Sequence, residues 1–301
     1  MRKNIAIFAL FMGLFFPISA MALTAIFYQP QAADTKISTQ AWPTLFHSVR
    51  QQGFDALIIQ WSEYGDFLKG NGDRDWLVQR VIEANNAGLK LIIGLKSDPD
   101  VFSKLHESPS TLRNYFNKLT QENKSLINYW VSALPNDAIL GWYLPLEIDD
   151  KEWRDQDKLE VLQSYLQRES SINAGKPTYI SSFFTGNMTP QNYANMLINL
   201  KRNSTIKLWI QDGGGTNRLT KSERTLYLNQ LSNCKDPIAD GVIYEIFHQT
   251  QQDEKFLAQN LSTANLASKL KMRAPCQGDS IFFEMRYLIT LPPAAPPHEI
   301  P

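Results

Sequence analysis

The 301-residue sequence contains only two cysteines and four histidines, and neither residue type occurs in a metal-ligand spacing. It has no G-x-S-x-G nucleophile elbow and no glycine-rich nucleotide fingerprint after its first strand-like run. It also lacks an excess of basic charge, because its Lys plus Arg and its Asp plus Glu both number 30. These absences disfavour a metal centre, serine-hydrolase chemistry, a dinucleotide site and a nucleic-acid-binding surface. No cofactor is implied.

The first 22 residues have the pattern of a signal peptide. Arg2 and Lys3 precede an apolar run over residues 5–18, and Ala-Met-Ala at residues 20–22 fits the small-x-small cleavage rule. The run of about 14 residues is short for a membrane span, which needs roughly 20. We therefore expect cleavage before Leu23 and a periplasmic or secreted protein with no stable membrane anchor. An uncleaved anchor is the alternative.

Both cysteines, Cys234 and Cys276, lie in the part of the chain expected to be exported. In an oxidising compartment they could form a disulfide, which would stabilise the fold by about 4 kcal/mol in the chain-entropy model. Two free thiols are the alternative, because a sequence does not report the distance between the two Cα atoms.

Eight apolar, strand-like runs alternate with helical patterns over residues 23–290. The runs cover residues 23–29, 54–61, 90–95, 138–147, 177–184, 205–211, 241–247 and 280–287. The helical patterns cover residues 40–52, 73–88, 109–133, 156–173, 190–201, 221–231 and 253–270. This alternation predicts an α/β fold, a single-domain (β/α)8 TIM barrel, with an open doubly wound sheet as the alternative. Only a proline-rich tail, residues 291–301, follows the last run, so we expect a disordered tail where the eighth helix would stand.

Two glutamates near the ends of strand-like runs are the candidate catalytic residues. Glu147 closes the fourth run, and Glu245 lies in the seventh run on the face opposite its apolar residues. Active sites of TIM barrels lie at the carboxyl ends of the strands, so both side chains should face that mouth. Glycosidic bond cleavage needs a protonated acid and a second carboxylate that attacks or activates water. A loop carboxylate that caps a helix or pairs with a lysine is the alternative for Glu147.

The eighth run offers a further charged pair. Alternation places Glu284 and Arg286 on the face opposite Phe283 and Met285. We expect both charged groups to point into the barrel mouth and to bind substrate, with Arg286 neutralising Glu284. A structural ion pair inside the barrel is the alternative.

Other residues near the strand ends could line a sugar-binding cleft. The candidate aromatic platforms are Trp61, Trp142, Tyr143 and Trp209, and burial in the core is the alternative for each. The candidate polar contacts are Gln60, Asp149, Gln211 and Asp212. Three glycines, residues 213–215, follow Asp212 and allow a backbone turn that side chains would forbid, either as a close-packed substrate loop or as an anion-binding nest.

Three motifs in order resemble a bacterial family of uncharacterised TIM-barrel glycosyl hydrolases. They are Gln-Trp at residues 60–61, Gly-Trp-Tyr-Leu-Pro-Leu-Glu-Ile-Asp at residues 141–149, and Gln-Asp-Gly-Gly-Gly at residues 211–215. The layout is more distantly similar to the clan A retaining glycosidases. That resemblance implies that Glu147 is the acid/base and Glu245 the nucleophile. Leu146 stands where those enzymes usually carry an asparagine that contacts the substrate 2-hydroxyl.

The sequence therefore predicts an exported barrel that hydrolyses a bacterial poly- or oligosaccharide. A barrel that binds saccharide without cleaving it, in a polysaccharide export or cell-envelope system, is the alternative. The missing asparagine favours the binding protein, and the paired carboxylates favour the enzyme.

Overall fold

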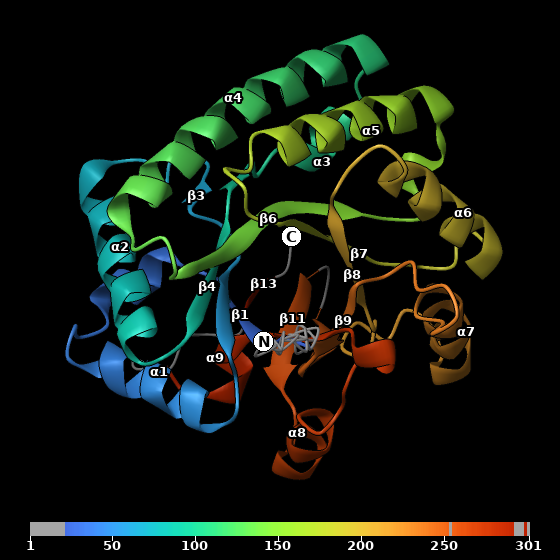
Figure 1. Cartoon of the computed structure of the whole chain (residues 1–301). Helices are drawn as coiled ribbons and strands as arrows, with labels where there is room; N and C mark the ends of the chain where they lie inside the picture. The colour runs from blue at the N-terminus through green and yellow to red at the C-terminus, as the bar shows by residue number, and fades with distance from the viewer. Residues whose placement is uncertain (1–21, 253–254, 292–297, 300–301) are drawn as a thin grey trace, which may run out of the picture.

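Eight parallel strands form a closed barrel in the computed structural model, which describes residues 22–252, 255–291 and 298–299. Around the barrel the order is β1-β12-β9-β8-β7-β6-β4-β2, and Figure 1 shows the helices surrounding it. These strands are β1 (Thr24–Tyr28), β2 (Ala56–Ile59), β4 (Lys90–Gly94), β6 (Ile139–Ile148), β7 (Thr178–Ser182), β8 (Lys207–Gln211), β9 (Gly241–Glu245) and β12 (Asp279–Phe283). The predicted TIM-barrel architecture is confirmed, and the open sheet is excluded.

The helices connect successive strands on the outside of the barrel. The longer ones are α1 (Ala41–Gln51), α2 (Asn71–Asn86), α4 (Pro109–Ala133), α5 (Gln156–Ser171), α6 (Pro190–Lys201) and α7 (Lys221–Leu231). The shorter elements are α3 (Val101–Leu105), α8 (Thr263–Lys269) and α9 (Met285–Leu288), with 3-10 turns η1 (Ala32–Lys36), η2 (Glu152–Arg154) and η3 (Pro275–Gln277). Within the described part of the chain, no helix is long and apolar enough to cross a membrane.

Helix starts follow from local capping. The side chains of Ser108, Thr189 and Thr220 each accept a hydrogen bond from the third residue of the helix that they precede. Proline then occupies the first position of α4 and α6, where its missing N–H leaves no donor unpaired.

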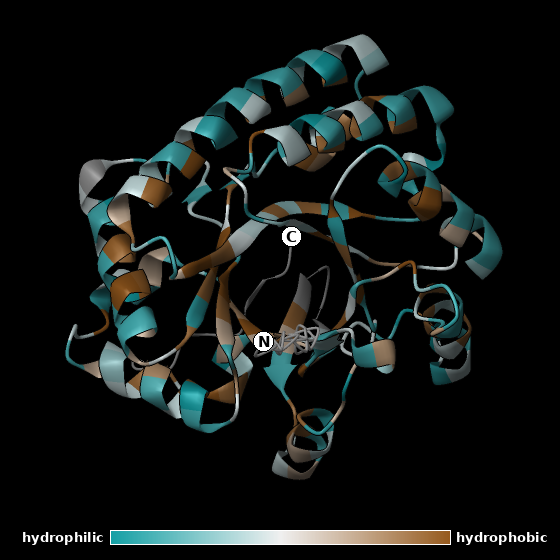
Figure 2. Ribbon diagram, viewed as in Figure 1, coloured by the Kyte–Doolittle hydropathy of each residue, from teal (hydrophilic) through white to brown (hydrophobic). Residues whose placement is uncertain are grey.

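Apolar side chains fill two layers. One cluster lies inside the barrel and includes Phe27, Ile58, Ile92, Tyr143 and Trp209. A larger cluster lies between the strands and the helices. Figure 2 shows the consequence, with brown strands inside a ring of helices that present teal residues outward. Alternation along each strand therefore decides which side chains reach the barrel axis.

The structure departs from the predicted elements after the seventh barrel strand. The strands β10 (Phe247–Gln252) and β11 (Lys255–Asn260) pair as an antiparallel hairpin, so the helix predicted over residues 253–270 is wrong for residues 255–260. The eighth strand ends at Phe283, and the one-turn helix α9 follows instead of the predicted strand residues. From the tail, β13 (His298–Glu299) pairs with β11. The signal-peptide prediction, and the remainder of the predicted tail beyond Leu291, lie outside the described residues.

Candidate active site

Glu147 is the next-to-last residue of β6, the fourth strand of the barrel in chain order. A register shift against β7 falls between Leu144 and Glu147. The Glu147 side chain is partly exposed, and its Oε1 accepts a 2.6 Å hydrogen bond from Nε2 of Gln211 on β8. Burial, followed by the charge of Asp149, raises the pKa of Glu147, while the Gln211 bond opposes the rise. A partly exposed carboxyl with a raised pKa is suited to donating a proton.

Glu245 ends β9, the seventh barrel strand, and only 3% of it is exposed. It lies two residues after Ile243, a member of the cluster inside the barrel, and so has the same strand face. Its Oε2 accepts hydrogen bonds from the backbone N–H groups of Gly215 (2.5 Å) and Thr216 (3.2 Å). Burial and the charge of Asp212 raise the pKa of Glu245 to about 7. The loop after β8 therefore holds one oxygen of this carboxylate.

Tyr143, Ser181 and Gln60 contribute further polar groups inside the barrel, where Tyr143 and Ser181 are buried. The Tyr143 hydroxyl lies 2.8 Å from Ser181 Oγ, and burial together with the charge of Glu147 raises the pKa of Tyr143. Gln60 follows β2 on the face of Ile58, and its Oε1 is buried without a hydrogen-bond partner. Ser181 was not among the candidates chosen from the sequence. It lies two residues after Tyr179 on β7, so strand alternation could have shown that the two side chains share a face.

Three of the four predicted aromatic platforms, Trp142, Tyr143 and Trp209, lie in the core, and their prediction as cleft-lining residues is wrong. Trp142 is fully buried outside the barrel, where its Nε1 donates to the Asn173 carbonyl at 2.8 Å. Trp209 is fully buried inside the barrel, and its Nε1 donates to Asp279 Oδ2 at 3.1 Å. Because Asp279 is the first residue of β12, Trp209 lies toward the end opposite the mouth.

The predicted orientation of Glu284 and Arg286 is also wrong. Phe283, not Glu284, packs with the cluster inside the barrel. Glu284 is 1% exposed, its Oε2 accepts from the Gln29 N–H at 2.9 Å, and burial raises its pKa to about 7. Arg286 lies in α9 and pairs chiefly with Asp34 at 2.7 Å, with Glu284 3.8 Å away. The strand ends before these residues, so strand alternation does not apply to them.

Asp149 and Asp150 shape the turn that follows Glu147. Asp149 is 4% exposed, and its Oδ1 accepts from the N–H groups of Lys151 (2.7 Å) and Glu152 (2.6 Å). Asp150 accepts from the Thr185 N–H (2.9 Å) in the loop after β7. The structure thus assigns to Asp149 a turn-forming contact instead of the substrate contact predicted.

Three carboxylates beside the mouth share one arrangement, in which each holds the backbone of a loop that follows a neighbouring strand. Glu284 holds the chain after β1, Asp150 holds the loop after β7, and Glu245 holds the loop after β8. We call them the clamp carboxylates. Glu147 differs from them, because its hydrogen bond comes from a side chain and it remains partly exposed.

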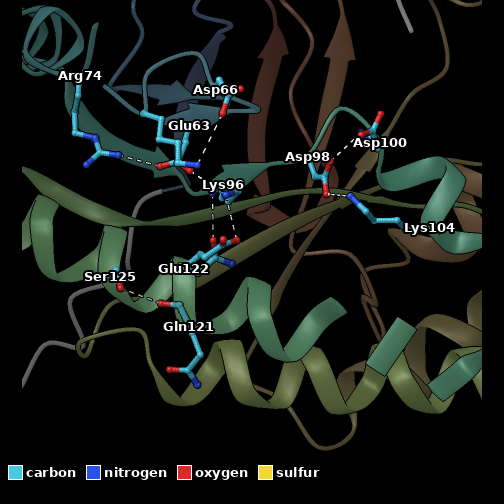
Figure 3. A network of polar contacts seen from close by, with 12 residues as sticks. Glu63, Asp66, Arg74, Lys96, Asp98, Asp100, Lys104, Gln121, Glu122 and Ser125 are labelled. Atoms are coloured by element: carbon cyan, nitrogen blue, oxygen red, sulfur yellow. Dashed lines mark hydrogen bonds and ion pairs between the residues drawn. The ribbon is translucent and has the colours of Figure 1, made fainter. Parts of the chain in front are cut away.

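A charged network braces the rim on the side of β2 and β4, as Figure 3 shows. Glu63 of β3 (Glu63–Tyr64) lies 2.9 Å from Arg74 of α2 and 3.0 Å from Lys96 of β5 (Lys96–Ser97). Lys96 also contacts Glu122 of α4 at 3.2 Å. The loop that this network fixes carries Trp61, whose ring packs against Tyr64 in a tilted arrangement with centroids 4.7 Å apart. Trp61, the remaining predicted tryptophan platform, lies beside the rim, although only 8% of it is exposed.

No group of three or more His, Cys, Asp or Glu side chains arranged to hold a metal occurs among the residues that the structure describes. The arrangement at the mouth is instead one of carboxylates, amides and hydroxyls.

Comparison with known proteins identifies the family. Residues 23–296 match the family described as Domain of unknown function (DUF4434). The chain belongs to this family. It is also 38% identical over 273 residues to the Escherichia coli (strain K12) protein "Uncharacterized protein YbcH", covering 89% of this chain and 91% of that protein.

Solved structures with the same fold are glycoside hydrolases. A Bacteroides thetaiotaomicron protein titled "putative alpha-L-fucosidase" superposes with a TM-score of 0.61 at 17% identity, over 94% of this chain and 91% of its own. An intracellular xylanase of Thermoanaerobacterium saccharolyticum gives 0.55 at 11% identity, over 87% and 86% of the two chains. At these identities the likeness establishes a glycosidase-like barrel fold, and function has to be argued from the site.

Proposed function

We propose that this protein is a glycoside hydrolase that acts on a bacterial poly- or oligosaccharide outside the cytoplasm. The observation that carries the proposal is the pair Glu147 and Glu245, presented by the fourth and seventh barrel strands at one mouth in different surroundings. Two carboxyl groups whose surroundings differ can take the separate roles of acid and nucleophile that glycosidic cleavage needs. The glycosidase-like fold supports the same reading.

In this proposal Glu147 is the proton donor. Burial raises the pKa of both glutamates, so the assignment rests on accessibility: the Gln211 amide holds the Glu147 carboxyl at 2.6 Å while leaving it partly exposed. Glu147 would protonate the glycosidic oxygen as the bond to the anomeric carbon breaks, and the resulting carboxylate would then accept a proton from water in the second step.

Glu245 is the nucleophile or base. The Gly215 and Thr216 N–H groups hold Oε2, and among the described residues Oε1 accepts no hydrogen bond. Oε1 would attack the anomeric carbon to form a glycosyl ester, which water would hydrolyse with help from Glu147. Gln60, with its unpartnered Oε1, and Trp61 would contact the sugar.

One observation favours a second candidate, a barrel that binds saccharide without cleaving it, within an export or cell-envelope polysaccharide system. Glu245 is almost fully buried and holds a loop in the same manner as the other clamp carboxylates, Asp150 and Glu284. A carboxylate committed to a loop in this way would leave Glu147 without a partner for hydrolysis.

A hydrolysis screen tests the proposal. The chain from Leu23 onward is incubated with envelope and exopolysaccharide fractions, beside Glu147→Gln and Glu245→Gln, with exposed Glu160→Gln on α5 as the matched control. We expect product from the wild type and the control and none from the two site variants. Saccharide that binds but is never shortened would instead establish the binding protein.

The role of Glu245 has its own test. In Glu245→Ala, azide can occupy the space of the missing carboxylate and attack the anomeric carbon. A glycosyl azide of inverted configuration would identify Glu245 as the nucleophile of a retaining enzyme. Product from Glu245→Ala without azide, at the wild-type rate, would refute any catalytic role for Glu245.

A further inference from the structure

Asp212 lies at the centre of a buried set of contacts beside Glu245. It follows β8, is 5% exposed, and its Oδ1 accepts hydrogen bonds from the N–H groups of Gly214 (3.0 Å) and Glu245 (3.1 Å). Its Oδ2 pairs with Nζ of Lys269 on α8 at 2.5 Å. One carboxylate thus ties together the glycine loop, the backbone of the candidate nucleophile and a helix that follows the hairpin.

The glycine loop, residues 213–215, packs tightly against Lys269 and Phe247. Gly213 has a φ of +61°, and a Cβ on Gly214 would lie 2.5 Å from Lys269 Nζ. A Cβ on Gly215 would lie 2.8 Å from the Phe247 ring. The space that these glycines leave lets the backbone approach Glu245 and donate to its Oε2. On the other side, the Gly215 carbonyl accepts from the Gln249 N–H of β10 at 2.8 Å.

The charges around Glu245 come from two elements. Asp212, after β8, is the negative group that favours a proton on Glu245, and Lys269, from α8, is the positive group that opposes it. The charge of Arg273, after α8, opposes the rise in the pKa of Tyr244. The Tyr244 side chain lies on the opposite face of β9 from that of Glu245. Lys269 has 22% of its side chain exposed, so its charge is only partly screened by solvent.

We propose that Asp212 and Lys269 are positioning residues for Glu245: Asp212 fixes the backbone and the loop that orient the carboxylate, and Lys269 offsets the charge of Asp212 so that Glu245 is ionised when it reacts. The inference rests on the proposed function for its kinetic consequence only. The electrostatic coupling is a property of the folded protein and is measurable without a substrate.

The test follows the titration of Glu245 by carboxyl carbon NMR, with its signal assigned by its loss in Glu245→Gln. The midpoint of the Glu245 signal is compared between variants. Lys269→Met leaves Asp212 uncompensated, so this midpoint should rise by about one pH unit, a tenfold change in proton affinity. Lys269→Arg should restore it, and Lys271→Met, a nearby exposed lysine, should leave it unchanged.

The double variant Asp212→Asn with Lys269→Met removes both charges, and its midpoint should fall back below that of Lys269→Met. A midpoint that stays at the wild-type value in Lys269→Met, or stays raised in the double variant, overturns the proposal. With a substrate in hand, the acidic limb of the kcat/KM profile should move with the NMR midpoint. A midpoint that moves while the profile does not would refute Glu245 as the nucleophile and leave the coupling in place.

Discussion

Removal of the disulfide between Cys234 and Cys276 should destabilise the protein without altering its site. The structure joins these two residues, resolving the pairing that the sequence left open. Cys234 follows α7 and Cys276 lies in η3, just before β12, so the link ties two loops at the amino ends of the strands, away from the mouth. That end of a TIM barrel serves stability, while the carboxyl ends carry the chemistry.

The magnitude follows from the length of chain that the disulfide closes. The two cysteines are 42 residues apart, and a loop of this size lowers the entropy of the unfolded chain enough to contribute about 4 kcal/mol at 25 °C. For a chain of this size, each kcal/mol corresponds to roughly 2 °C in Tm, so the loss should be about 8 °C. The test is urea and thermal unfolding of the double variant Cys234→Ser with Cys276→Ser.

Two controls separate the entropic mechanism from damage to the fold. Wild-type protein reduced with dithiothreitol should unfold at the same midpoint as the double variant. Saccharide binding or turnover, measured well below the transition, should match the oxidised wild type. A loss below about 1 kcal/mol would refute the loop-entropy reasoning. Normal stability with impaired activity would refute the separation between the disulfide and the mouth.

Three further changes probe the mouth and the surrounding helices. Gly215→Ala places a methyl group against the Phe247 ring, so the loop should move off Glu245 and kcat should fall about tenfold or more; unchanged turnover would contradict this. Glu63→Gln deprives its half-buried lysine and arginine partners of their shared charge and should lower the free energy of unfolding by roughly 2 kcal/mol, whereas a neutral result would show that the rim brace is dispensable. Burial raises the pKa of Glu169, a residue of α5 whose Oε2 accepts a hydrogen bond from Asn123 of α4, from 4.5 in the unfolded chain to about 7. The stability contributed by its proton is therefore present below pH 4.5 and lost as the pH rises through 7, by roughly 3 kcal/mol, a decline that urea unfolding should find absent in Glu169→Gln.

The barrel was predictable because each of its strands is a compact apolar run between helical patterns. The hairpin of β10 and β11 was not, since Lys255, Leu257 and Ala258 have good helix propensity and only pairing with β10 makes the segment a strand. The eighth strand was predicted to extend to residue 287, four residues beyond its end at Phe283, for a related reason. Nothing in the apolar pattern after Phe283 distinguishes a continuing strand from the turn of helix that forms there.

At the site, position in the chain predicted more than side-chain type did. Strand position and alternation predicted that Glu147 and Glu245 lie at the carboxyl ends of their strands, as they do, while their catalytic roles stay a prediction. Trp142 and Tyr143 are neighbours of similar character, yet one packs outside the barrel and the other inside, as alternation requires. Trp209 does face inward, but its depth depends on its contact with Asp279, seventy residues later in the chain. The sequence did not identify Lys269 as a site residue, because its contact with Asp212 depends on where α8 lies after the hairpin.

The clamp carboxylates have a consequence for protein engineering. TIM barrels are often treated as scaffolds whose loops can be exchanged one at a time. A loop grafted after β8 of another barrel would lack the carboxylate that holds it, because Glu245 belongs to the next strand, β9. The loop after β7 depends in the same way on Asp150, which lies just after the end of β6. The unit of exchange in this barrel is therefore a loop together with the adjoining strand end, and single-loop grafts should misfold locally even when their lengths match.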